Sequence, residues 1–286
     1  DRIFEEQRQK TGVDYFDYYL IHAIDQELYS LYNEMDCFNW LIEKKKQGLV
    51  KHIGFSYHDS AEFLDQVLTE HPEMEFVQLQ MNYLDWESAE VQSRKCYEVA
   101  EKHGVPVIVM EPVKGGTLAN MVGEPARILS ALDENASYAS YAVRYAASLP
   151  NVILVLSGMS DLKQLQDNTA YMKDFQPLTD KEQQAIGKVV EELEKLPTIP
   201  CTNCRYCVEG CPKKIRIPDI FGVYNMGVQF GLTDVTRGSY RCQIDGSGKA
   251  GDCIKCGKCE AQCPQHLEIR KLLEEAADIY EKEMHL

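Results

Sequence analysis

The sequence predicts an α/β chain with a parallel sheet covered by helices, followed by a smaller cysteine-rich helical unit. Residues 1–197 alternate helix-like and strand-like segments, and each of five short apolar strands precedes a helix. Nine of the eleven cysteines lie after residue 200, eight of them in two copies of one motif. Two prolines at 197 and 200 interrupt regular structure between these parts. We therefore expect domains at residues 1–197 and 198–286.

The five strands are expected where short apolar runs occur, at residues 16–21, 52–55, 76–80, 105–110 and 152–156. Helical periodicity predicts helices between and around them, at residues 2–11, 37–47, 88–103, 137–149, 162–171 and 180–195, and one capped by Ser60. This alternation fits both a doubly wound sheet and a (β/α)8 barrel. No Gly-x-Gly-x-x-Gly follows any strand, which counts against the dinucleotide-binding doubly wound fold.

The charge and hydropathy of the chain exclude some classes of partner. The net charge is −15, and residues 198–286 carry twelve basic and twelve acidic residues, so the acidic excess lies in residues 1–197. Such a surface argues against nucleic-acid binding, and no apolar run approaches the ~18 residues of a membrane span. The first ten residues are charged and resemble no secretory signal, so clustered cysteines predict a protein of the reduced cytoplasm.

The eight clustered cysteines fit the ligand pattern of two [4Fe–4S] clusters. Each copy reads Cys-x2-Cys-x2-Cys-x3-Cys-Pro, and in two-cluster ferredoxins the fourth cysteine ligates the other cluster. One predicted cluster therefore has the ligands Cys201, Cys204, Cys207 and Cys263. The other has the ligands Cys253, Cys256, Cys259 and Cys211. Zinc is disfavoured because zinc ribbons use isolated Cys-x2-Cys pairs with four ligands per ion.

The segment between the two motifs is expected to be helical, because residues 219–230 carry apolar residues at helical spacing. The unit therefore resembles the α-helical ferredoxins embedded in larger oxidoreductases. Cys242 lies outside both motifs and is interpreted as an ordinary thiol. The basic residues in and after the motifs would offset cluster charge or dock an acidic electron carrier, and we prefer the first interpretation. They are Lys213, Lys214, Arg216, Lys255 and Lys258.

Five segments of the first domain resemble the aldo-keto reductases, in the order that this family has them. They are residues 14–22 (DYFDYYLIH), 51–56 (KHIGFS), 77–83 (VQLQMNY), 108–118 (IVMEPVKGGTL) and 157–168 (SGMSDLKQLQDN). The resemblance implies a (β/α)8 TIM-barrel-like fold in which these strands are numbers four to eight. About 90 upstream residues, with strands one to three and the family's catalytic Asp, Tyr and Lys, would then be missing from a barrel of ~250 residues. We expect the natural polypeptide to be longer.

The resemblance also implies a catalytic histidine and an NAD(P) site. His22 matches the histidine of the catalytic tetrad, which would orient a substrate carbonyl. Ser56 and Gln78 match the side chains that bind the nicotinamide carboxamide, and Met110 stands where the family stacks an aromatic ring. The remaining expected cofactor contacts are Val113, Gly115, Gly158, Gln164 and Asn168.

Some departures from the family pattern bear on the cofactor. Tyr57 stands at the place of a second carboxamide ligand, usually Asn. Residues 158–161 contain no Arg or Lys and Gln164 replaces another Arg, so both NAD and NADP remain possible. Lys114 could contact the pyrophosphate. Ordinary structural roles for these side chains, such as a helix cap or a polar strand end, remain alternatives.

The leading functional hypothesis is an NAD(P)-linked oxidoreductase that acts on a small carbonyl or alcohol substrate and exchanges electrons with an external carrier through its clusters. The second is a non-catalytic electron-transfer or redox-sensing protein that uses the barrel as a scaffold. In a third, weaker reading, the clusters only stabilise the C-terminus.

Overall fold

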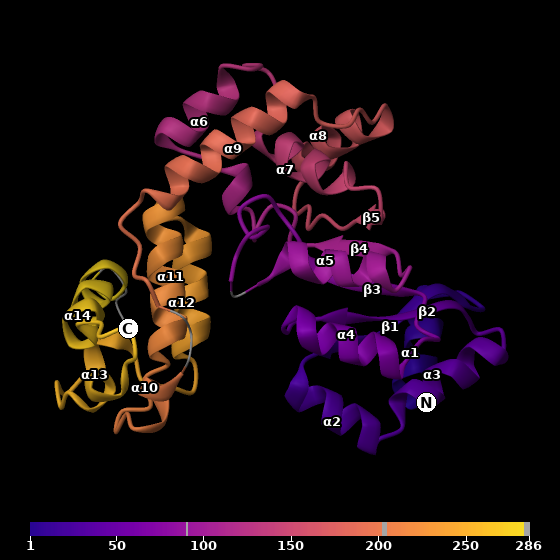
Figure 1. Cartoon of the computed structure of the whole chain (residues 1–286), viewed down its shortest axis with the longest axis horizontal. Coiled ribbons are helices and arrows are strands. Elements are labelled where there is room, and N and C mark those ends of the chain that lie inside the picture. The colour runs from indigo at the N-terminus through magenta and orange to yellow at the C-terminus, as the bar shows by residue number, and fades with distance from the viewer. Residues whose placement is uncertain (90, 202–204, 283–286) are drawn as a thin grey trace. The chain divides into compact units, whose positions relative to one another are not determined.

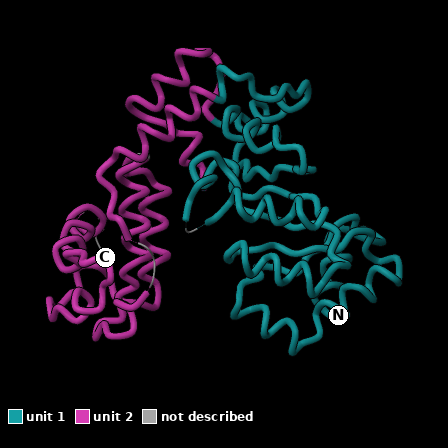
Figure 2. The backbone as a smooth tube through the Cα atoms, in the orientation of Figure 1, with its two compact units in different colours: residues 1–114, 139–183 teal, residues 115–138, 184–286 magenta. Residues whose placement is uncertain are grey.

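The computed structural model describes residues 1–89, 91–201 and 205–282. Within them the chain forms two compact units, each built from two segments of sequence (Figure 2). Unit 1 comprises residues 1–114 and 139–183, and unit 2 comprises residues 115–138 and 184–286. Each unit is described by itself below.

Unit 1 contains a five-stranded sheet in which every neighbouring pair is parallel, as the sequence predicts (Figure 1). Short runs rich in β-branched and aromatic residues form its strands, and the side chains of the three central strands are mostly buried. The strands are β1 (Phe16–Ile24), β2 (Val50–Tyr57), β3 (Phe76–Gln80), β4 (Val107–Met110) and β5 (Val152–Val155).

The strand order is β1-β2-β3-β4-β5, so each strand pairs with the strand before and after it in sequence. A doubly wound sheet reverses its order at a switch point, whereas a barrel adds each strand beside the previous one. The observed order is therefore that of a barrel segment. β1 and β5 each pair with one strand only, so the five described strands form an open sheet.

Helices connect the strands of unit 1. They are α1 (Arg2–Thr11), α2 (Gln26–Glu34), α3 (Cys37–Lys46), α4 (Ala61–Glu70), α5 (Ser93–Lys102), α7 (Tyr138–Ala147) and α8 (Leu162–Lys173). Side-chain caps begin several of them: Asp25 accepts from the Leu28 amide at 2.7 Å and Ser60 from the Phe63 amide at 3.3 Å. Helix α5 begins five residues later than expected, after a turn that starts near Asp85.

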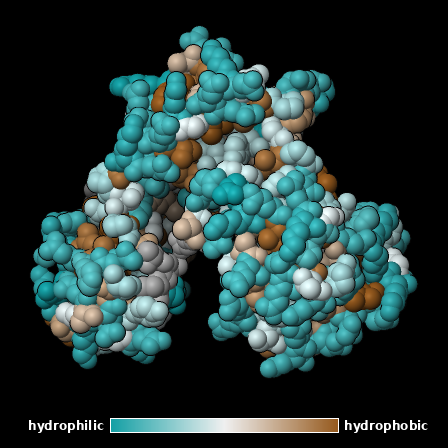
Figure 3. Space-filling model, viewed as in Figure 1, coloured by the Kyte–Doolittle hydropathy of each residue, from teal (hydrophilic) through white to brown (hydrophobic). Residues whose placement is uncertain are grey.

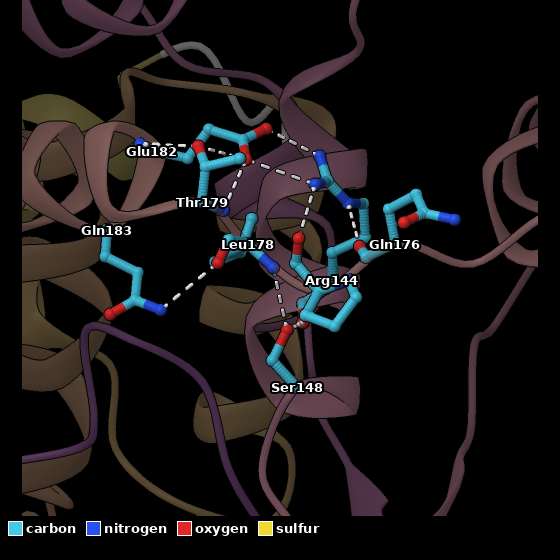
Figure 4. Close-up of polar contacts among 8 residues, drawn as sticks. Arg144, Ser148, Gln176, Leu178, Thr179, Glu182 and Gln183 are labelled. Atoms are coloured by element: carbon cyan, nitrogen blue, oxygen red, sulfur yellow. Dashed lines mark hydrogen bonds and ion pairs between the residues drawn. The ribbon is translucent and has the colours of Figure 1, made fainter.

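The start of helix α9 (Asp180–Glu194) is fixed to α7 by Arg144 (Figure 4). Its guanidinium bonds the Glu182 carboxylate at 2.7 Å and the Gln176 carbonyl oxygen at 3.0 Å. The Thr179 hydroxyl caps the helix by accepting from the Glu182 amide, and the Glu182 carboxylate accepts from the Thr179 amide at 2.8 Å. Burial opposes ionisation of Glu182, but the bonds from Arg144 and Thr179 outweigh it and lower the pKa. This ionised pair stabilises the fold above the usual carboxyl pKa, and the stabilisation is lost as pH falls through the lowered value.

Unit 2 is helical where it is described, in agreement with the expectation for the segment between the cysteine motifs. Its elements after α9 are α10 (Tyr206–Glu209), α11 (Ile217–Phe230), α12 (Asp234–Ile244), η2 (Ala250–Asp252), α13 (Lys258–Gln262) and α14 (Ile269–Tyr280); η1 (Thr117–Ala119) and α6 (Gly123–Ser130) precede them in sequence. Two buried rings, Tyr240 and Tyr280, stack with centroids 4.9 Å apart. The Tyr280 hydroxyl donates to the Val223 carbonyl oxygen at 2.9 Å, which fixes α14 to α11.

The face of the molecule drawn in Figure 3 is mostly hydrophilic, with hydrophobic residues scattered among polar ones. Among the described residues, no helix has the length and apolar character needed to cross a membrane.

Gly54 in β2 provides a test of the strand packing. A Cβ at this position would lie 2.2 Å from the Phe76 carbonyl oxygen and 2.8 Å from the Phe76 ring. Gly54→Ala should therefore lower the free energy of unfolding by about 1–3 kcal/mol, because backbone and ring would have to move apart. Unfolding with denaturant measures this change in the free energy of unfolding.

The matched control is Gly187→Ala, in the interior of α9 with open space at its Cβ position. This change should leave stability unchanged or raise it by up to about 1 kcal/mol, because alanine favours helix more than glycine does. A Gly54→Ala protein as stable as the Gly187→Ala protein would contradict the packing argument.

Candidate active site and metal centres

His22 lies near the end of β1, where the strand becomes irregular. Ala23 has a left-handed φ of 55°, and the pairing with β2 shifts between Ile21 and Ile24. This irregularity points the Ala23 amide at the Ser56 hydroxyl oxygen, 2.7 Å away. The carbonyl oxygen of His22 accepts from the Tyr32 hydroxyl at 2.7 Å, while its side chain is exposed. The backbone of His22 is thus fixed and its imidazole is accessible.

Three predicted cofactor residues lie on neighbouring strands. Ser56 of β2 is in register with Gln78 of β3, and the Gln78 side-chain amide lies 3.3 Å from the Met110 sulfur at the end of β4. The Ser56 side chain is 1% exposed, and its oxygen accepts from the Ala23 amide. The structure therefore brings Ser56, Gln78 and Met110 into one row.

Tyr57, which stands at the family's second carboxamide position, has an internal partner. Its hydroxyl donates to the Ser60 carbonyl oxygen at 2.6 Å, and its side chain is 2% exposed. Burial raises the pKa of this phenol. Nearby, burial lowers the pKa of His58, with a smaller electrostatic contribution from His22.

A polar network that the sequence analysis missed lies after β3. The buried Asp85 carboxylate accepts from Lys114 at 2.6 Å, from Asn82 at 2.8 Å and from Gln80 at 3.0 Å. The Asn82 side-chain oxygen accepts from the Leu84 and Asp85 amides, which is an Asx turn. The Asn-x-x-Asp spacing was the available signal. Lys114, the expected pyrophosphate contact, is thus paired with a buried carboxylate.

The segment after β4 contains several left-handed residues. Glu111, Lys114, Gly115 and Gly116 have φ values of 57°, 49°, 63° and 92°. Two of them are not glycine, and such strain concentrates at functional sites. Val113 is half-buried and Gly115 is exposed.

Of the remaining expected cofactor contacts, Gly158 lies in the loop between β5 and α8, and Gln164 and Asn168 lie in α8. Gly158 is exposed. The Gln164 side-chain oxygen accepts from the Ser160 amide at 2.8 Å. Asn168 donates to the Ser157 hydroxyl at 2.7 Å and accepts from the Tyr171 hydroxyl at 2.6 Å. Gln164 and Asn168 thus stabilise this loop.

Two cavities in unit 2 are lined by cysteines of both motifs. The cavity that we call the first is lined by Cys201 and Cys207 of one motif and by Cys263, the fourth cysteine of the other. Cys204 lies outside the described residues. The second cavity is lined by Cys253, Cys256 and Cys259 together with Cys211. Each motif therefore places its fourth cysteine at the cavity of the other.

The two cavities are similar in size and share a wall. Their empty volumes, open solvent at the mouth included, are about 320 and 330 Å³, and the buried side chain of Ile217 lines both. Four thiols facing one cavity suit a cubic iron–sulfur group, since each corner iron takes one thiolate. Among the described residues, no three Cys, His, Asp or Glu side chains converge closely enough to hold a single metal ion. Cys242 is exposed and lines neither cavity.

The cavities are related by the internal repeat, since equivalent positions of the two copies line opposite cavities. Ile215 lines the second cavity, and its equivalent, Leu267, lines the first. Burial raises the pKa of the Cys259 thiol, so loading the second cavity with a group that binds thiolate would release a proton at neutral pH.

Solved structures of aldo-keto reductases share the fold of this chain, which covers slightly less than two thirds of their length. The holo form from Bacillus halodurans is 21% identical, with a TM-score of 0.51 over 66% of this chain and 63% of that one. The Klebsiella pneumoniae reductase in complex with NADPH is 16% identical, with a TM-score of 0.52 over 66% and 63%. The Brucella melitensis reductase is 22% identical, with a TM-score of 0.51 over 66% of each chain.

Two family models match the sequence, and they leave little of it uncovered. The model of a 4Fe-4S dicluster domain matches residues 200–268. No curated protein matches the chain. The model of the aldo/keto reductase family matches residues 1–191, about two thirds of the sequence. The chain therefore belongs to the aldo/keto reductase family.

Proposed function

We propose that this protein is an NAD(P)-linked oxidoreductase that exchanges electrons with an external carrier through two [4Fe–4S] clusters. The observation that carries the proposal is the exchange of the fourth cysteine between the two cavities. It gives the second cavity four thiols and the first cavity three among the described residues, in a chain that belongs to the aldo/keto reductase family.

The cofactor would bind at the ends of β2, β3 and β4. Ser56 and Gln78 offer a hydroxyl proton and an amide to the nicotinamide carboxamide, and the Met110 sulfur would lie against the ring. Val113 and Gly115 would approach the phosphates, and Gly158, Gln164 and Asn168 the adenosine end. Lys114 already has a carboxylate partner in Asp85, so a phosphate would compete with that carboxylate.

His22 would orient the substrate, a small carbonyl compound or alcohol. Its imidazole is exposed near the end of a barrel strand, where this fold places its chemistry. A neutral imidazole donates one hydrogen bond, which could direct a carbonyl oxygen. The fixed backbone of His22 would keep this donor in place.

The clusters would be bound by the eight motif cysteines, Cys204 included. When bound, they supply one-electron transfer. The thiols of Cys201, Cys207 and Cys263 would bind one, and those of Cys211 with Cys253, Cys256 and Cys259 the other. The shared wall at Ile217 would keep the two sites adjacent and exclude water between them.

A second function, electron transfer or redox sensing without barrel catalysis, is favoured by one observation. The expected carboxamide ligand position is occupied by Tyr57, whose hydroxyl is fully engaged by Ser60 inside the protein. This alternative predicts no aldehyde turnover by the full-length protein. Turnover that His22→Ala abolishes would exclude it.

The carboxamide site gives a test of cofactor binding. Gln78→Ala should weaken NADH or NADPH binding to the full-length protein about tenfold, because it removes an amide that would pair with the carboxamide. Quenching of the bound nicotinamide fluorescence reports the affinity. Gln47→Ala is the matched control, since Gln47 is exposed at the end of α3. Equal affinities for both variants would contradict the proposed site.

The exchanged cysteines give a second test. In anaerobically reconstituted protein, Cys211→Ser should disturb the cluster held by the second motif, although Cys211 belongs to the first. Iron content and the electron paramagnetic resonance (EPR) spectrum report the loss. Cys242→Ser should leave both clusters intact, because this thiol lines neither cavity. A Cys211→Ser protein with the iron content and spectrum of Cys242→Ser would refute the assignment.

Coupling between the two parts is testable by anaerobic mixing with NADH or NADPH. Reduction of the clusters should bleach their visible absorbance, and Gln78→Ala should slow this bleaching with its loss of affinity. Cofactor binding that causes no bleaching would contradict electron transfer between the nicotinamide site and the clusters.

A further inference from the structure

Equivalent positions of the internal repeat carry different charges at the two cavities. Lys213 lines the second cavity, whereas its repeat equivalent Gln265 lines the first. Arg270 lines the second cavity, and its equivalent Pro218 lines the first. Three cations therefore line the second cavity, with Lys258, while no described residue lining the first is charged. The repeat thus offers two near-identical sites that differ in local charge.

The ion pairs near each cavity preserve this difference. Arg270 bonds the Glu260 carboxylate at 2.8 Å. One cation, Arg205, lies near Cys207 of the first cavity without lining it, and it pairs with Asp219 at 2.9 Å. Each copy thus has one arginine–carboxylate pair, but only Arg270 lines its cavity.

Lys213 and Lys258 add positive charge at the second cavity that no described carboxylate pairs with. Lys213 and Lys258 are exposed, and neither forms an ion pair with any residue that the structure describes. Their charges are therefore screened by water and salt but are not neutralised by a neighbouring carboxylate.

We infer that Lys213 and Lys258, together with Arg270, give the second cavity the higher reduction potential of the two cluster sites. A cluster with four thiolate ligands is negatively charged, and reduction adds one more negative charge. Nearby cations stabilise the reduced form more than the oxidised form, because Coulomb attraction grows with charge. An electron shared between the two sites would therefore reside at the second cavity.

This inference rests on the proposed function, because it requires both cavities to bind clusters. The inference concerns which of the two sites has the higher reduction potential and which residues cause the difference. The two cysteine motifs alone do not determine this. Lys213 follows the first motif in sequence, yet it lines the cavity of the second.

The test is a potentiometric titration of the anaerobic holoprotein with dithionite, followed by EPR. Two midpoint potentials are expected, and Cys256→Ser and Cys201→Ser assign them to the second and first cavities. Lys213→Gln and Arg270→Gln should each lower the higher potential and leave the lower one in place. Arg270→Lys should preserve the higher potential, because it keeps the charge.

The internal repeat suggests a variant that adds a positive charge at the first cavity, and an exposed lysine outside both motifs in sequence provides a control. Gln265→Lys should raise the midpoint potential of the cluster in the first cavity and so reduce the difference between the two midpoint potentials. Lys188→Gln, on an exposed position of α9 outside both cavities, should change neither potential. Raising the ionic strength should reduce the difference between the two midpoint potentials of the unaltered protein, because salt screens the charges of exposed lysines.

Equal potentials, or a higher potential at the first cavity, would overturn the inference. So would potentials that Lys213→Gln and Arg270→Gln leave unchanged. A holoprotein preparation without iron would overturn the proposed function as well, whereas two clusters ranked in the opposite order would overturn this inference alone.

Discussion

The exchange of the fourth cysteine between the two motifs is the constraint on which the C-terminal region depends. Cys211 can line the second cavity, and Cys263 the first, only if the two motifs pack against each other. The helices that follow the motifs, α11 and α14, then supply the shared apolar wall. The stacked tyrosines come from α12 and α14. One apolar core thus packs against both groups of cysteines. In the proposed function, crossed ligation would itself keep the two clusters adjacent.

In the barrel segment, the corresponding constraint is the sequential parallel order of the strands. It brings the ends of β1 to β4 to one edge, so that single side chains from different strands become neighbours. Ser56, Gln78 and Met110 form their row for this reason. The close approach of β2 to β3 at Gly54 is part of the same packing.

Three of the left-handed non-glycine residues in this unit lie beside residues with a proposed function, and two others, Asp36 and Gln92, begin helices. Ala23 follows His22, and Glu111 and Lys114 follow the last strand that carries a predicted cofactor contact; all three are non-glycine residues with left-handed φ. Each such conformation costs about 1–3 kcal/mol and persists only when surrounding contacts fix it. Here the Ser56 hydroxyl, the Asn82 amide and the Asp85 carboxylate provide those contacts.

Local sequence determined what depends on short-range chemistry. Apolar runs between helical patterns predicted five parallel strands, and the spacing of cysteines predicted two four-cysteine motifs, because both signals lie within a few residues. The tertiary structure decided what depends on register and packing between segments distant in sequence. Only strand register shows that the Gln78 amide contacts the Met110 sulfur and that the Ala23 amide donates to the Ser56 oxygen. Only the packing of the loops after β3 and β4 shows that Asp85 binds Lys114. Likewise, Lys213 is a plain basic residue in the sequence, and only the crossed packing of the two motifs assigns its charge to the second cavity.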